Sequence, residues 1–264
     1  MRITWCGVRG STPAPGAEFV RYGGHTSCVA ISVGEERPTL VLDAGTGLRR
    51  VTALLDGGAF DGHILLSHLH WDHLQGLPFF EAGDRPDAVV SLHLPEQGAD
   101  PEQVLARAMS PPHFPIGPDA LRGTWRFNGL EEGIHQIGDF EVLAREIPHK
   151  GGRTFGYRVS HGGLSLAYLP DHDASQPGDG AQELARDVDL LIHDAQFRED
   201  EVDVARRFGH TTISEAIELA RTAAAHRIVL FHHAPDRSDD EMDVIASAPG
   251  LLVAVEGQTL DVGS

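Results

Sequence analysis

Apolar and polar positions alternate in short blocks along this chain, and most of the blocks are typical of β-strands. Runs of apolar and β-branched residues bounded by Gly, Pro or charged residues predict strands. These runs cover residues 3–6, 26–33, 39–42, 63–67, 88–94, 140–147, 154–159, 164–169, 188–192, 228–231 and 251–255. Tight turns at residues 34–38 and at Gly162-Gly163 predict hairpins between neighbouring strands.

Between these strands the apolar residues recur at helical spacing. The spacing predicts helices over residues 48–55, from Pro101 onward, and over residues 212–224. Strands interspersed with helices predict mixed sheets covered by helices. We find no low-complexity linker between the blocks, so we expect a single domain over residues 1–264.

Composition places the chain among ordinary globular proteins. Its 264 residues are 41% hydrophobic and 23% charged. No apolar run approaches the roughly 18 residues that span a membrane, and the first residues lack the pattern of a secretory signal. We therefore expect a cytoplasmic protein with no membrane partner. Cys6 and Cys28 are too few for a disulfide framework, and we expect both to be buried thiols.

The charge balance limits the kinds of partner. Twenty-one basic and 39 acidic residues give a net charge of −18. A broad surface for long nucleic acid needs clusters of Lys and Arg, so such a partner is disfavoured, although a small local patch stays open. The chain also holds 16 histidines, and histidine is the commonest metal ligand.

Four of the potential metal ligands follow one predicted strand directly. Residues 68–73 read His-Leu-His-Trp-Asp-His, with three imidazoles and one carboxylate in six positions. Burying these groups next to a strand would be expensive unless they bind something. His68 and His70 can reach one ion, and Asp72 and His73 can reach a second. Imidazole and carboxylate suit Zn²⁺, and also Mn²⁺ or Fe.

This His-x-His-x-Asp-His pattern resembles the metallo-β-lactamase fold superfamily, and the resemblance covers the whole chain. It implies an α/β (α+β) fold, an αββα sandwich of two mixed β-sheets flanked by helices. It also implies two divalent ions, with Zn²⁺ expected and Mn²⁺ or Fe as alternatives. The further ligands that it implies each end a predicted strand: His149, Asp171 and His232. His233 is the alternative to His232.

By this resemblance the ligands fall into two sites that share Asp171. The first site is His68, His70 and His149, and the second is Asp72, His73 and His232. Asp43, in the segment Leu-Asp-Ala-Gly-Thr-Gly, is expected to orient a ligand histidine rather than to bind metal. Its alternative role is to cap a helix.

Two positions narrow the class of enzyme within the superfamily. The oxygen-reducing di-iron relatives have glutamate where this chain has His70, and the common di-zinc β-lactamases have cysteine at the position equivalent to Asp171. The resemblance therefore implies a hydrolase with an oxygen-bridged pair of metals, either a phosphodiesterase or a thioester or lactone hydrolase of the glyoxalase II type.

Two later segments favour the phosphodiesterase. Residues 190–197 and Gly209-His210-Thr211-Thr212 look like the acidic motif and the His-x-Thr motif of ribonuclease Z and its small-molecule relatives. By this resemblance His210 is the catalytic histidine beside the leaving group and Asp194 orients it. The alternative for His210 is a polar residue at a helix N-terminus, and His193 is expected to be structural.

The resemblance also implies a mechanism. A hydroxide held between the two ions attacks phosphorus, Asp72 accepts a hydrogen bond from this nucleophile, and His210 assists the departing alkoxide. An RNA-processing ribonuclease and a non-catalytic nucleotide-binding module remain alternatives. Resemblance to ribonuclease Z also suggests a homodimer.

The length of one segment favours a small substrate. Only 21 residues separate His149 from Asp171, which leaves no room there for the tRNA-gripping arm of ribonuclease Z. We expect a small or cyclic nucleotide-like phosphodiester. The Pro-rich segment 110–115, with His113 and Phe114, should bound its pocket, and a base could stack on Phe114. His25 either lines the site from the N-terminal loop or lies in an exposed turn.

Overall fold

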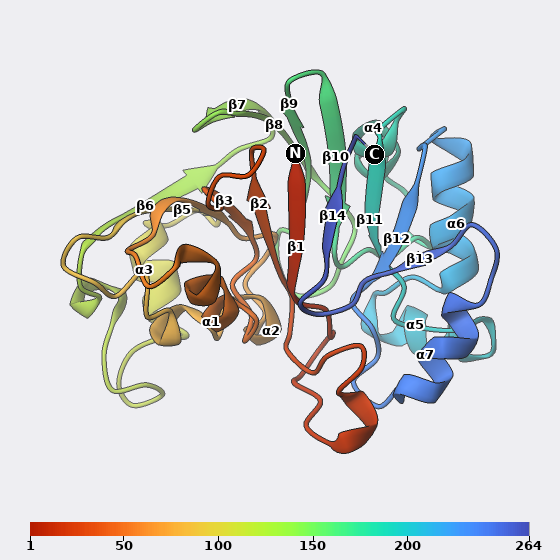
Figure 1. The fold of residues 1–264 in the computed structure, drawn as a ribbon, viewed down its shortest axis with the longest axis horizontal. Helices are drawn as coiled ribbons and strands as arrows, with labels where there is room; N and C mark the ends of the chain where they lie inside the picture. The colour runs from red at the N-terminus through yellow and green to blue at the C-terminus, as the bar shows by residue number, and fades with distance from the viewer. Residues whose placement is uncertain (264) are drawn as a thin grey trace.

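The computed structural model describes residues 1–263 and shows two seven-stranded sheets packed face to face (Figure 1). The strand order is β14-β1-β2-β3-β4-β5-β6 in the first sheet and β13-β12-β11-β10-β9-β8-β7 in the second. Within the first sheet, the strands from β3 to β6 run parallel. Within the second, the strands from β10 to β13 run parallel. The sheets are therefore mixed, as predicted.

The first sheet consists of β1 (Arg2–Gly7), β2 (Cys28–Ser32), β3 (Leu40–Leu42), β4 (Asp61–Leu65), β5 (Val89–Pro95), β6 (Thr124–Leu130) and β14 (Thr259–Asp261). The second consists of β7 (Gly133–Ile137), β8 (Phe140–Glu146), β9 (Phe155–His161), β10 (Leu164–Leu169), β11 (Leu190–Asp194), β12 (Ile228–Phe231) and β13 (Leu252–Val253). Because β14 pairs with β1, the last strand of the chain completes the sheet that the first strand begins.

Helices cover the outer face of each sheet (Figure 1). Beside the first sheet lie α1 (Leu48–Val51), α2 (Trp71–Leu74) and α3 (Pro101–Ala106). Beside the second lie α4 (Gly180–Ala185), α5 (Val202–Phe208), α6 (Ile213–Thr222) and α7 (Asp239–Ala246). The 3₁₀ helices are η1 (Ala17–Phe19), η2 (Thr52–Leu55), η3 (Leu77–Phe79), η4 (Pro118–Ala120) and η5 (Glu199–Glu201). The predicted αββα sandwich is confirmed.

Three buried layers hold these elements together. The central layer lies between the sheets, where the Phe231 ring contacts Trp5 at 6.0 Å and Tyr168 at 5.7 Å between centroids. A second layer packs the first sheet against its helices, and a third packs the second sheet against α4 and α6. Cys6 and Cys28 are buried in the second layer and both are free thiols, as expected.

The alternation of residues did not predict β6, β7 and β14. The strand β7 reads Gly-Ile-His-Gln-Ile and lies at the edge of the second sheet. Its half-polar sequence is a weak strand signal, and β7 is extended because it pairs with β8. The predicted helix 212–224 is α6, which begins after Thr212 because Thr212 and Glu215 form a capping box. The predicted single domain runs to residue 264, which lies outside the described residues.

The ends of the strands determine where the candidate site forms. Asp171, Asp194 and His232 lie at or just after the carboxyl ends of β10, β11 and β12, which are parallel neighbours. Carboxyl ends of parallel strands meet at one edge of a sheet, so residues far apart in the chain come together there. Among the described residues, no helix has the length and apolar character of a membrane span.

Candidate metal centre

The structure brings the seven predicted metal ligands together in two clusters. In each cluster the potential ligand atoms lie within 4.8 Å of one another. One cluster contains His68, His70, His149 and Asp171, and the other contains Asp72, His73, Asp171 and His232. Asp171 belongs to both, so the grouping matches the one that the resemblance implies.

The two oxygens of Asp171 face different clusters. Oδ2 lies 3.5 Å from Nε2 of His149 and 3.7 Å from Nε2 of His68. Oδ1 lies 3.0 Å from Nε2 of His73 and 3.1 Å from Nε2 of His232. Asp171 would therefore offer one oxygen to each of two ions.

The chemistry of these donors fits divalent cations. Nε2 of His68 and Oδ1 of Asp171 are buried without a hydrogen-bond partner, a state that is costly in a protein interior. A bound cation would satisfy both atoms. Nitrogen and carboxylate oxygen donors suit Zn²⁺, Mn²⁺ and Fe alike, so the donor set supports two divalent ions without selecting one metal.

Hydrogen bonds orient two of the ligand rings toward the clusters. Nδ1 of His73 donates to Oδ2 of Asp43 at 2.7 Å, and Nδ1 of His149 donates to the Gly209 carbonyl at 2.7 Å. Each bond leaves Nε2 as the nitrogen that faces the cluster. Metal-binding histidines generally donate their other N–H in this way.

Asp43 has the contacts that an orienting group would make. Its carboxylate accepts hydrogen bonds from Ser67 N at 2.6 Å, Ser67 Oγ at 2.9 Å and Tyr168 OH at 2.8 Å, besides the one from His73. Its backbone has a φ of 58°, a left-handed conformation that is uncommon for residues other than glycine. The structure therefore places Asp43 behind His73, and the helix α1 has no side-chain cap.

Asp72 is held by a residue that the sequence analysis did not single out. The backbone N–H of Ser11 donates to Oδ2 of Asp72 at 2.7 Å. Although burial opposes ionisation, His73 and His232 lower the pKa of Asp72 well below its usual range, so it is a carboxylate at neutral pH. Ser11 adopts a φ of 63° at this close approach, and its local sequence carries no signal of the contact.

The choice between the two adjacent histidines is made by the turn after β12. His232 has a φ of 57° and its Nε2 lies 3.3 Å from Oδ2 of Asp72. Its ring packs so closely on Gly10 that a Cβ at Gly10 would collide with it. His233 points elsewhere, with Nε2 2.9 Å from the Ala254 carbonyl. The structure therefore places His232, not His233, in the cluster.

The pair of His210 and Asp194 lies beside the second cluster. Nδ1 of His210 is 2.9 Å from Oδ2 of Asp194, and the His210 ring stacks on the His232 ring at 5.2 Å between centroids. Burial alone lowers the pKa of His210, but the charge and hydrogen bond of Asp194 outweigh it and raise the pKa to about 9. Both side chains are buried, so Asp194 holds the ring in place and favours its protonated form.

Two buried histidines support Asp194 from behind. Nδ1 of His193 donates to the Asp194 carbonyl at 2.6 Å, and Nε2 of His193 lies 3.1 Å from Nδ1 of His172. His193 is thus structural, as expected. His172 was missed, although it stands in an Asp-His-Asp sequence directly after β10.

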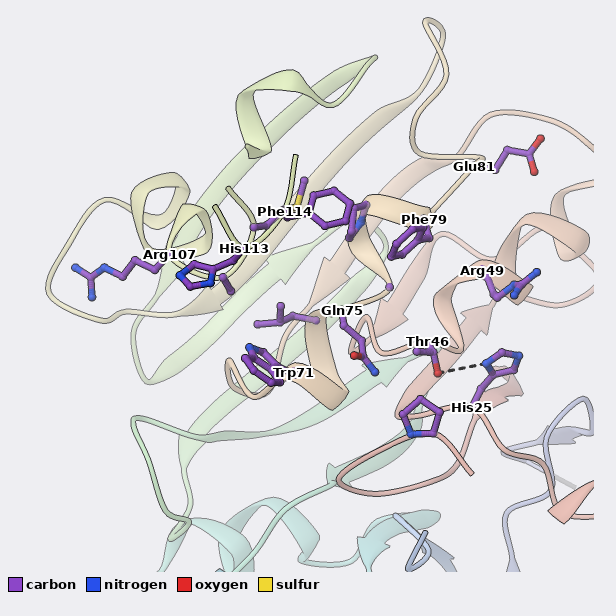
Figure 2. A pocket seen from close by; sticks show the side chains of 16 residues that line it. His25, Thr46, Arg49, Trp71, Gln75, Phe79, Glu81, Arg107, His113 and Phe114 are labelled. Carbon is purple, nitrogen blue, oxygen red and sulfur yellow. Dashed lines mark hydrogen bonds between the residues drawn. The ribbon is translucent and has the colours of Figure 1, made fainter. Parts of the chain in front are cut away.

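A cleft of about 1020 Å³ is lined by residues of α2, of η3 and of the N-terminal loop (Figure 2). Trp71 is on one side, and Phe79 and Phe114 are on another. His113 and Phe114 line it, as the Pro-rich segment suggested, and so does His25, whose Nδ1 is 3.2 Å from Oγ1 of Thr46. The N-terminal loop therefore contributes to the wall of the cleft.

The sandwich and its paired ligand clusters define a metal-binding domain of the metallo-β-lactamase kind. The family model described as the β-lactamase superfamily domain matches residues 39–233. The chain belongs to this family, and the resemblance drawn from residues 68–73 is confirmed.

Curated relatives and solved structures are similar to the chain over nearly its full length. It is 24% identical to the ribonuclease Z of Natronomonas pharaonis, covering 99% of this chain and 98% of the relative. It is 28% identical to that of Halorubrum lacusprofundi, covering 88% and 86%. The human short-form tRNase Z superposes with a TM-score of 0.72 at 21% identity, covering 99% of both chains. A diphosphatase from the PhnP family superposes at 0.76 and 19% identity, covering 98% and 97%.

Proposed function

We propose that this protein is a metal-dependent phosphodiesterase that hydrolyses a small phosphodiester. The observation that carries the proposal is the His210–Asp194 pair, with His210 Nδ1 4.0 Å from Oδ2 of the shared Asp171. A protonated imidazole beside a pair of metal sites suits a reaction in which an alkoxide leaves. The relatives named ribonuclease Z and the diphosphatase support phosphoester chemistry.

Each cluster would hold one divalent ion, Zn²⁺ by preference, with Mn²⁺ or Fe as alternatives. Such a pair supplies a water of lowered pKa and positive charge for the oxygens of phosphorus. Within the clusters only Asp72 and Asp171 carry negative charge, so they offset half of the charge of two divalent ions. The centre stays positive and suits an anionic diester.

The protein's own groups then move the protons. Asp72 is ionised and, held by Ser11, can accept a hydrogen bond from the attacking water. His210, whose protonated form Asp194 favours, donates its proton to the departing oxygen as a general acid. Asp194 keeps the ring in place and stabilises its charge before the transfer.

The segment between His149 and Asp171 supports a small substrate. It contains the whole β9–β10 hairpin, which turns at Gly162 and Gly163, both at positive φ. The hairpin lies in the second sheet, and with the net charge of −18 it argues against a dedicated surface for long RNA. The names of the curated relatives favour RNA processing as the second candidate function.

A substrate panel on one metal-loaded sample tests the proposal. It would contain bis(4-nitrophenyl) phosphate, 2′,3′-cyclic nucleotides, a precursor tRNA and a glutathione thioester. We expect turnover of the small phosphodiesters, and none by Asp171→Ala prepared in the same way. Turnover of the thioester alone would instead indicate a hydrolase of the glyoxalase II type, and turnover of the precursor tRNA alone would indicate a ribonuclease.

A further inference from the structure

The large cleft and the metal clusters are formed in part by neighbouring residues of the same chain segments. Trp71 lines the cleft, and its chain neighbours His70 and Asp72 each belong to one cluster. Pro13 also lines the cleft, and Ser11, two residues earlier, donates its N–H to Asp72. Because two separate segments contribute residues to both, the cleft is the nearest described hollow for the rest of a substrate whose phosphate would lie at the clusters.

The cleft presents large aromatic side chains to solvent. Trp71 is 74% exposed and Phe79 is 64% exposed. Phe79 and Phe114 meet edge to face at 5.8 Å between centroids, so these two rings are already held in place. Exposed apolar groups gathered in one hollow mark binding sites, and ordered rings stack on a flat ligand at little entropic cost (Figure 2).

The charge around the cleft is opposite to that of the chain as a whole. Arg49 and Arg107 line it together with a single carboxylate, Glu81. Within residues 1–263 neither arginine makes an ion pair, whereas the chain carries a net charge of −18. An aromatic ligand that also carries a phosphate therefore matches both the rings and the charges.

From this arrangement we infer that the cleft is a nucleobase subsite, so that the substrate is a nucleoside phosphodiester whose base stacks on Trp71, opposite Phe79 and Phe114. The inference deepens the proposed function and rests on it for the position of the phosphate. The volume, about 1020 Å³, suits a whole nucleoside rather than a single small ring.

Paired substrates that differ only in the base test this subsite. One is adenosine 2′,3′-cyclic phosphate, and the other is methyl ribofuranoside 2′,3′-cyclic phosphate, which has the same diester and no base. Trp71→Ala should lower kcat/KM on the adenosine substrate about ten- to a hundred-fold, mainly through KM. Its kcat/KM on the substrate without a base should stay unchanged, which also shows that the metal centre is intact.

Two further variants serve as controls. Trp71→Phe should restore most of the lost kcat/KM, because a smaller aromatic ring still stacks. Ile134→Ala removes a side chain that is 68% exposed, similar to Trp71, but that lies on the edge strand β7 outside the cleft. This control should leave the kinetics of both substrates unchanged.

A binding measurement separates the subsite from catalysis. Adenosine 5′-monophosphate added to metal-free protein should quench tryptophan fluorescence, whereas ribose 5-phosphate should not. The quenching should be lost in Trp71→Phe, since Trp5 is buried between the sheets and Trp125, on β6, does not line the cleft.

The outcomes distinguish this inference from the proposed function. Equal effects of Trp71→Ala on the two substrates, or no effect on either, would overturn the subsite and leave the phosphodiesterase standing. Failure of the metal-loaded wild type on both substrates would contradict the phosphodiesterase, while the nucleotide-binding measurement would still decide the subsite. Sedimentation could instead show a wild-type dimer that Trp71→Ala abolishes. If the kinetics then do not depend on the base, the cleft is an interface between two copies and the subsite is overturned.

Discussion

Oδ2 of Asp43 lies 2.7 Å from Nδ1 of His73, thirty residues further along the chain. This hydrogen bond links the end of β3 to the start of α2 and turns Nε2 of His73 toward Asp171. The same carboxylate is held by Ser67 and Tyr168, so its position is fixed from three sides. The orientation of His73 thus depends on a buried acid that belongs to neither metal cluster.

Replacing Asp43 should weaken metal binding without removing a ligand. In Asp43→Asn the amide still fills the space, but it no longer offers His73 a charged acceptor. We expect the affinity for the ion in the second cluster to fall about 10- to 100-fold. Titration with Zn²⁺ against a chelating indicator measures this, with unfolding curves as the check on folding. Unchanged affinity at both clusters would contradict the orienting role.

The adjacent histidines after β12 should behave differently. His232→Ala removes a ligand of the second cluster, and we expect one bound metal equivalent to be lost by elemental analysis. His233→Ala removes the hydrogen bond to the Ala254 carbonyl, and we expect full metal content with a lower unfolding temperature. Loss of metal in His233→Ala with retention in His232→Ala would reverse the assignment.

The general-acid role of His210 predicts a dependence on the leaving group. We expect His210→Ala to keep both metals and to slow an alkyl phosphodiester about 100- to 10,000-fold. The loss on a 4-nitrophenyl ester should be much smaller, because nitrophenolate leaves without a proton. Steady-state rates on the two esters measure the difference. Equal losses would show that His210 acts in some other way.

Asp194 should act through His210 rather than independently. We expect Asp194→Asn to reduce the same rate, and the double variant with His210→Ala to lose little more than His210→Ala alone. Additive losses in this double-mutant cycle would show that the two side chains act separately.

Acid should destabilise the fold through a histidine pair away from the metal clusters. Nε2 of His93 lies 3.2 Å from Nδ1 of His63, and burial lowers the pKa of His93 to about 4. The unfolded chain, with a histidine pKa near 6.5, then binds the proton first. Stability from this group is present above about pH 6.5 and falls by about 3 kcal/mol as the pH drops toward 4. Denaturant unfolding of the metal-free wild type and of His93→Gln between pH 7 and about pH 4 measures the difference. If the free energy of unfolding falls equally with pH in the two proteins, His93 is not the source of the acid sensitivity.

Much of the candidate site could be predicted from local order along the chain. The segment His68 to His73 places four donors within six residues, which no ordinary loop requires. The later donors each follow an apolar run, so they were expected to come together at the ends of neighbouring strands. Asp43 was also expected behind a ligand, because it follows such a run and precedes a Gly-rich turn.

Other residues carry no local signal of their role. Ser11 reaches Asp72 only because the N-terminal loop folds back across the clusters at positive φ. His172 looks like an ordinary loop residue until β10 and β11 run parallel and bring it to His193. The aromatic cleft likewise needs α2, η3 and the segment around Phe114 in one place, so only Phe114 among its rings was expected to contact a substrate.

The sequence by itself determined where most of the strands and helices lie and in which order the metal donors follow one another. These features depend on residue type and spacing, and they were enough to indicate the family. Only the tertiary structure decided between His232 and His233, since neighbouring residues point to opposite sides and the left-handed turn after β12 selects which one faces Asp171. The tertiary structure also decided that Asp171 offers one oxygen to each cluster. The histidines that face the two oxygens come from distant segments, and their separation along the chain does not indicate how close they lie in space.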